Sequence, residues 1–322
     1  MAALKKILSI LLRISVSLAL LIFLFNQVDR KSLLEIIKGC DKGLLFLAFV
    51  VFFFNYLFCL FRWIMLLKDA EIHLPLSRVI ISFSGGIFFN LFLPSAIGGD
   101  VIRSIDLASH TRKPKEIVST VILDRLSGSV GLVILIFFSL LLGWNLIQDR
   151  SVLLSVGIIF ALLSLILLVL FNDSLYSFIN RFLNVPNAGK FRNSIKNLHQ
   201  EMHGFKHKKF AIFTNLLVSL LVQANSPVTF YLIALAIGLK IKLIYFFVFI
   251  PIIGAITMLP ISLGGLGLRD ATTIYFFAKA GVSRDLAFAM SLLNFSFILI
   301  YGSIGGLIYV LTVHHRRIQH HP

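Results

Sequence analysis

The chain has 322 residues and a mass of 36.1 kDa, and 58% of its residues are hydrophobic, with a mean hydropathy of +0.95. These values exclude an ordinary soluble domain and indicate an all-α polytopic integral membrane protein. The formal charge of +16 comes from 30 Lys and Arg residues against 14 Asp and Glu residues. Because the basic residues lie mostly between apolar runs and form no compact basic domain, we expect an anionic lipid surface as their partner and no nucleic acid.

Six apolar segments are long enough to cross the hydrocarbon core of a bilayer, which takes about 20 helical residues. They are residues 7–27, 44–67, 126–147, 152–171, 210–239 and 287–313. The first segment begins like a signal peptide, but it lacks a small-residue cleavage site, so we expect it to remain as a helix. Cys40 and Cys59 do not have the paired spacing of a metal or redox site.

A short motif occurs twice in apolar surroundings. Its two copies align without gaps, pairing Leu93 with Leu259, Pro94 with Pro260, Gly98 with Gly264, Gly99 with Gly265, and Arg103 with Arg269. Proline, paired glycines and arginine are unfavourable inside a membrane helix unless the backbone breaks there. We therefore predict two re-entrant helical hairpins, at residues 79–110 and 243–280, while an ordinary kinked crossing at each motif is the alternative.

Three predicted spans separate the two motifs, so the second copy would enter the membrane in the opposite orientation to the first. Inverted repeats of this kind place a substrate site near the bilayer midplane in many transporters. We predict one membrane domain over residues 1–322, with repeats at about 44–147 and 210–313. Lys and Arg are more frequent in segments that this topology places inside, which predicts a cytoplasmic-membrane protein with both termini in the cytoplasm.

The long polar connection at residues 172–209 contains apolar residues at helical spacing, namely Phe191, Ile195, Leu198, Met202 and Phe205. This spacing predicts an amphipathic helix lying on the inner membrane surface. Histidines recur at four-residue intervals on the same helix, at His199, His203 and His207. They could bind a metal or sense pH, but we prefer a solvated helix face and predict no metal or cofactor.

Arg103 and Arg269 each follow a predicted break at the start of a helix. A helix N-terminus offers unpaired N–H groups, and a guanidinium added to it favours a phosphate or a carboxylate. We therefore predict a lipid headgroup site at these arginines. Alternatively, the arginines extend to headgroups at the membrane surface, or they pair with Asp100 and Asp270.

Asp124 and Arg125 lie beside each other at the edge of a long apolar run, where charges should be paired or should line a polar cavity. Asp124 could balance Arg103, or it could form a local pair with Arg125. Arg62 lies near the end of a predicted span, where extension of the side chain to the membrane surface would explain it.

Three polar residues inside apolar segments are candidates to line a cavity: Gln223, Asn225 and Asn294. Such residues also commonly bond neighbouring helices. Pro227 follows Gln223 and Asn225 closely, and it indicates either backbone opened to a cavity or a simple kink.

Together these motifs resemble the transmembrane region of lysylphosphatidylglycerol synthase, also called the flippase-like family. The resemblance rests on Asn90, Pro94, Gly98, Gly99, Asp100 and Arg103, on Asp124, Arg125 and Leu126, on Leu259, Pro260, Gly264, Gly265, Gly267, Arg269 and Asp270, and on Ala280, Gly281, Val282 and Ser283. In well-known relatives, this region moves an aminoacylated phospholipid between leaflets, and a cytosolic domain makes that lipid. This sequence ends at Pro322 without such a domain, so the resemblance implies a translocase and no enzyme.

The resemblance and the paired motifs predict a lipid translocase with a headgroup cavity between the two hairpins. One alternative is a non-transporting membrane partner that presents lipid to a separate synthase or glycosyltransferase. The other alternative is an ion-coupled transporter of small solutes, since Asp100 and Asp124 could take part in ion coupling. The two copies of the motif also differ, because Leu266 takes the place of Asp100 in the second.

Overall fold

The computed structural model describes residues 29–93, 98–111, 113–143, 209–258 and 265–319, parts of the segment 15–27, and isolated residues elsewhere. Its elements are helices, and the described residues form no strand. Four of the helices are long and apolar enough to cross a membrane: Lys42–Asp69, Pro114–Leu142, Phe210–Ala236 and Arg284–Thr312. The chain is therefore an all-α polytopic membrane protein, as predicted. About half of the span predicted at 7–27 and most of the span predicted at 152–171 lie outside the described residues.

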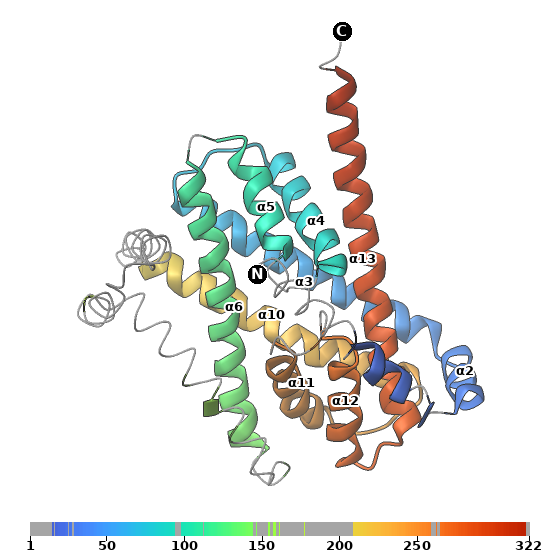
Figure 1. Cartoon of the computed structure of the whole chain (residues 1–322). Helices are drawn as coiled ribbons and strands as arrows, with labels where there is room; N and C mark the ends of the chain where they lie inside the picture. The colour runs from blue at the N-terminus through green and yellow to red at the C-terminus, as the bar shows by residue number, and fades with distance from the viewer. Residues whose placement is uncertain are drawn as a thin grey trace, which may run out of the picture.

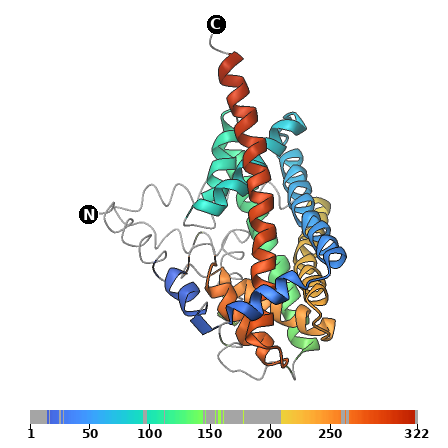
Figure 2. The same ribbon diagram turned by 90° about the vertical axis from the view of Figure 1, so that its right-hand side faces the viewer.

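The helices are, in chain order, α2 (Arg30–Lys38), α3 (Lys42–Asp69), α4 (Leu76–Phe92), α5 (Gly98–Ala108), α6 (Pro114–Leu142), α10 (Lys209–Ala236), α11 (Leu243–Thr257), α12 (Leu268–Ala278) and α13 (Arg284–Gln319). Figures 1 and 2 show α3 and α10 lying side by side across the molecule. In Figure 1, α6 and α13 run upright on either side of the two hairpins.

Helix α6 begins earlier than the span predicted at residues 126–147. It starts at Pro114, a residue well suited to the first helical turn because its missing N–H would have no partner there. The span predicted from hydropathy did not include the polar first half of α6, but Ser119, Thr120 and Asp124 are buried there. Asp124 and Arg125 therefore lie in the middle of a helix and not at the edge of a span.

The first predicted hairpin is present as two helices, α4 and α5, that pack against each other. The Oδ1 atom of Asn90 on α4 accepts a hydrogen bond from the N–H of Gly99 on α5, at 2.8 Å. A Cβ atom on Gly99 would lie 2.0 Å from the carbonyl oxygen of Gly86, so only glycine permits this close approach. Pro94, between the two helices, is outside the described residues, and Gly98 is the first residue of α5.

The second predicted hairpin consists of α11 and α12, which also pack against each other. Gly265 and Gly267 have φ angles of 80° and 76°, which L side chains rarely adopt, so glycine is needed at this break. Pro260 and Gly264 lie outside the described residues. In Figure 1, the end of α4, the start of α5 and the start of α12 all point toward the middle of the molecule. Opposite insertion of the two hairpins into a membrane stays a prediction.

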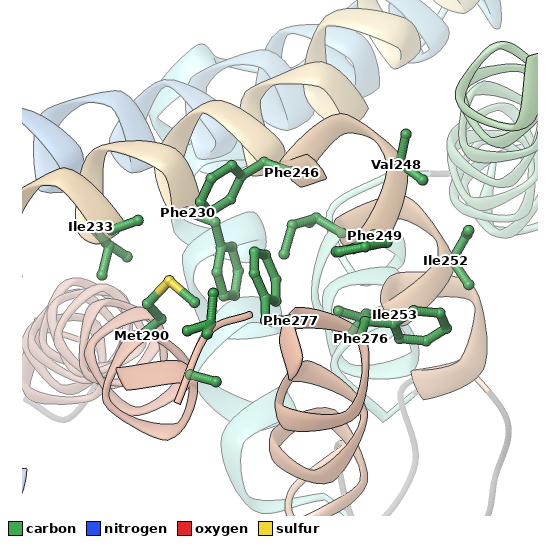
Figure 3. Packing of buried hydrophobic residues seen from close by; sticks show 14 of the residues in the cluster. Phe230, Ile233, Phe246, Val248, Phe249, Ile252, Ile253, Phe276, Phe277 and Met290 are labelled. Atoms are coloured by element: carbon green, nitrogen blue, oxygen red, sulfur yellow. The ribbon is translucent and has the colours of Figure 1, made fainter. Parts of the chain in front are cut away.

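The second hairpin is embedded in the larger apolar core, shown in Figure 3. Phe246 and Phe249 of α11 and Phe276 and Phe277 of α12 are fully buried or nearly so. The core is completed by residues of α10 and α13, among them Phe230, Ile233 and Met290. Burial of several aromatic rings stabilises the hairpin through many van der Waals contacts and ring–ring interactions.

Candidate functional site

Five charged side chains from three helices form a continuous chain beside the first hairpin. The Nη2 atom of Arg103 lies 2.9 Å from Asp100 and 2.8 Å from Asp124. The Nε atom of Arg62 lies 2.6 Å from Asp124, and Arg125 donates to Asp100. The order is Arg125, Asp100, Arg103, Asp124, Arg62, so each carboxylate lies between two guanidinium groups. We call these five residues the buried charge cluster.

Local geometry explains how the charges reach one another. Asp100 and Arg103 are three residues apart on α5 and therefore lie on one helix face. Asp124 and Arg125 are adjacent on α6 and point in different directions, so they contact different partners. The local Asp124–Arg125 pair considered from the sequence is thus not formed. Asp124 instead balances Arg103, which was the other possibility.

The buried charge cluster is enclosed except at one end. The side chains of Arg62, Arg103 and Asp124 are only 5–6% exposed. The side chain of Arg125 is 36% exposed. Its contact with Asp100 is made by Nε. Arg125 is therefore the accessible end of the chain of charges.

Aromatic rings hold the guanidinium of Arg103 in place. Its Cζ atom lies 4.7 Å from the ring centre of Trp63 and 5.7 Å from that of Phe83. The indole of Trp63 is itself oriented, because its Nε1 atom donates to Thr120 Oγ1 at 3.2 Å. A cation over an aromatic face is stabilised electrostatically, and more strongly when water is excluded.

The sequence interpretation of Arg62 was wrong. Extension to the membrane surface was expected, yet Arg62 is buried and donates from Nη1 to Ser219 Oγ on α10, at 3.0 Å. A Cβ atom on Gly128 would lie 3.0 Å from the same Nη1 atom, so glycine leaves room for the guanidinium. The available signal was that Arg62 and Asp124, both inside apolar segments, need partners.

Polar residues at four-residue intervals on α10 face α3 and α6. Asn215 donates to the carbonyl oxygen of Arg62 at 3.4 Å, and Gln223 donates to that of Gly128 at 2.9 Å. Asn215 and Ser219 were not identified from the sequence, although their spacing with Gln223 marks one helix face. Through this polar face, α10 of the second predicted repeat contacts the helices that carry the buried charge cluster.

The three candidate cavity-lining residues lie on α10 and α13. Like Gln223, Asn225 bonds a neighbouring helix, because its Nδ2 atom donates to the carbonyl oxygen of Val51 at 3.0 Å. Asn294 is buried on α13. Helix α10 continues through Pro227, so its backbone is not opened there. A cavity-lining role for these residues stays a prediction.

Arg269 belongs to a separate, smaller group on α12 and α13. Its Nη2 atom lies 3.1 Å from Asp270, and its Nε atom lies 3.1 Å from Ser291 Oγ. Asp270 also accepts the N–H of Gly267 at 3.0 Å, which connects the pair to the second break. Arg269 lies 5.0 Å from the ring centre of Phe295. One arginine and one aspartate make this group formally neutral.

The contacts described for Arg103 and Arg269 thus place the two arginines in different groups. Joint binding of one headgroup by both arginines stays a prediction. Within the part of the chain that the structure describes, no cluster of three or more His, Cys, Asp or Glu side chains could hold a metal ion. The helix with His199, His203 and His207 lies outside that part.

Comparison with known proteins supports the family resemblance that the paired motifs indicated. A membrane protein of the UPF0104 group from Pyrococcus horikoshii is 24% identical over 307 residues, which cover 88% of this chain and 91% of that protein. The family model for the lysylphosphatidylglycerol synthase TM region matches residues 10–306, a range that includes both breaks and both arginine groups. The chain therefore belongs to the family of the lysylphosphatidylglycerol synthase transmembrane region.

Proposed function

We propose that this protein moves a phosphate-bearing lipid between the leaflets of the cytoplasmic membrane. The observation that carries the proposal is the composition of the buried charge cluster, which contains three arginines and two aspartates. An unbalanced buried charge is costly unless an opposite charge comes close to it. A lipid phosphate supplies that charge, while the acyl chains remain in the bilayer.

The phosphate would enter at Arg125, the exposed end of the cluster. The side chain of Arg125 is 36% exposed, and the fork of N–H donors on a guanidinium matches the paired oxygens of a phosphate. Asp100 joins Arg125 to Arg103, so the phosphate would compete with this carboxylate for both guanidinium groups. The amide of Gly99 is already bonded to Asn90, so it is not a donor for the phosphate.

Membrane position and family membership support this role. Large apolar side chains are exposed on α3, α6 and α13, for example Phe46, Phe137 and Leu307, and would face acyl chains. The family match covers the transmembrane region of a lipid synthase, which agrees with a non-enzymatic role here. Alternating exposure of the site would come from movement of one predicted repeat against the other, with both termini in the cytoplasm.

The test uses purified protein in liposomes containing phosphatidylglycerol labelled with a fluorophore on one acyl chain. Bleaching of the outer leaflet by dithionite reports how fast lipid changes leaflets. We expect transport by the wild-type chain, and a rate reduced about tenfold or more in Arg103→Gln and Arg125→Gln, because a hydrogen bond to a charged group contributes about 1.5–3 kcal/mol. Lys68→Gln is the control, since Lys68 is exposed at the end of α3.

Equal rates in liposomes with and without wild-type protein would contradict a translocase. If this protein without transport activity co-purified with a synthase or glycosyltransferase, the lipid-presenting alternative would be favoured. Full transport by both arginine variants would instead show that lipid passes elsewhere, and it would remove the buried charge cluster as the headgroup site.

A further inference from the structure

We infer that Arg62 determines the charge selectivity of the headgroup site, so that lipids with a net negative headgroup are preferred over zwitterionic lipids. This inference rests on the proposed function. It concerns a residue that does not face the entering lipid and that acts on selectivity through the charge balance of the cluster.

Arg62 is the buried end of the chain of charges, and Arg125 is the exposed end. Arg125 and Arg103 can be assigned to Asp100 and Asp124, one carboxylate for each guanidinium. Arg62 is then the third cation, and it shares Asp124 with Arg103. A cluster without Arg62 would be formally neutral, whereas the cluster with Arg62 carries one positive charge.

Arg62 is unsuited to direct contact with a ligand. Its side chain is 6% exposed, and its guanidinium donates to Asp124 and to Ser219 on α10. It lies at the opposite end of the chain of charges from the exposed Arg125. Its influence on a bound phosphate must therefore be electrostatic, and such influence reaches far in a water-poor interior because screening is weak there.

Selectivity follows from the net charge of the complex. A headgroup with one negative charge neutralises a cluster with one positive charge, whereas a zwitterion leaves that charge uncompensated. An uncompensated buried charge costs free energy. With Arg62 removed, the preference should weaken or reverse, because the neutral cluster then matches the neutral headgroup.

The experiment compares transport of phosphatidylglycerol with that of phosphatidylethanolamine, both labelled on an acyl chain, in liposomes of one fixed composition. The measured quantity is the ratio of the two rates. We expect Arg62→Met to lower this ratio about tenfold relative to wild type. The double variant R62M/D124N should recover the ratio, because Arg103 and Arg125 against Asp100 again leave one positive charge.

Lys68→Met is the matched control, because it removes a positive charge from an exposed position on the same helix. It should leave the ratio unchanged. A single peak in size-exclusion chromatography and a cooperative melting transition above the assay temperature establish that each variant is folded. If Arg62→Met does not fold, Asp124→Asn replaces it: that cluster carries two positive charges, so its ratio should rise, and an unchanged ratio would overturn the inference.

Different results would contradict the proposed function and the role of Arg62. A wild-type protein that transports neither lipid contradicts the proposed function. A wild-type protein that transports lipid while Arg62→Met keeps the wild-type ratio overturns the role of Arg62 and leaves the proposed function intact. Loss of selectivity in Arg62→Met without recovery in R62M/D124N would also overturn it, because it would show that Arg62 acts by packing.

Discussion

The guanidinium of Arg103 is held between two carboxylates and an aromatic face. Asp100 and Asp124 accept its hydrogen bonds, and the ring of Trp63 covers it. This arrangement explains how a charge is tolerated away from water, since two carboxylates balance the guanidinium and an aromatic face covers it. The same arrangement holds Arg103 in one position before any ligand arrives.

Replacing Trp63 with Leu tests whether its ring supports Arg103. The change removes the ring under Arg103, the hydrogen bond to Thr120 and a fully buried volume. We expect a loss of stability smaller than the ~3–5 kcal/mol that truncation of a buried aromatic residue to Ala costs, because Leu refills part of the volume, and a lower melting temperature in detergent. Phe61→Leu is the control, because Phe61 is its exposed neighbour on α3. Equal melting temperatures in the two variants would contradict the supporting role of Trp63.

At the scale of elements, glycines allow α4 to lie close to both of its neighbours. Gly86 and Gly99 bring α4 and α5 together, and Gly305 on α13 lies against the backbone of Ser84 on α4. Small residues let helix backbones approach, which strengthens van der Waals packing where no hydrophobic driving force operates. The first hairpin therefore depends on shape as well as on charge.

A methyl group at Gly99 should separate the arms of this hairpin. Its Cβ atom would lie 2.0 Å from the carbonyl oxygen of Gly86, and backbone atoms cannot move aside cheaply. For Gly99→Ala we expect a melting temperature lower by several degrees and loss of lipid transport. Gly254→Ala in α11 is the control, since its Cβ atom would meet only Leu132 Cδ1 at 3.9 Å. If both variants behave alike, the close contact of α4 and α5 is not needed.

At the scale of the whole molecule, the two hairpins differ in their surroundings. The first is next to the buried charge cluster, and the second is enclosed by the aromatic core of Figure 3 with a neutral arginine–aspartate pair at its break. The proposed headgroup site therefore lies beside the first hairpin, and a headgroup role for Arg269 stays a prediction.

Opposite insertion of the hairpins is testable with single cysteines. In a variant without Cys40 and Cys59, His73→Cys precedes α4 and Lys240→Cys precedes α11, and both positions are exposed. The inverted repeat predicts that a membrane-impermeant maleimide labels position 73 from the cytoplasmic side and position 240 from the other side. Labelling of both from the same side would contradict the inverted repeat.

The sequence alone determined the class of the protein and the positions of its breaks. Composition and hydropathy established an all-α membrane protein, and the repeated proline, glycine pair and arginine located both hairpins, because such residues are costly in an uninterrupted membrane helix. Family membership followed from the same local patterns.

Only the tertiary structure decided which charges meet. Arg62 and Asp124 are 62 residues apart, and Arg125 pairs with Asp100 and not with its neighbour Asp124. Local periodicity predicts a helix and its apolar face, whereas the pairing of charges depends on how separate helices pack. The buried charge cluster has one more arginine than aspartates, whereas the group at Arg269 is neutral. The proposed selectivity depends on this excess charge, which is apparent only from the packing of α3, α5 and α6.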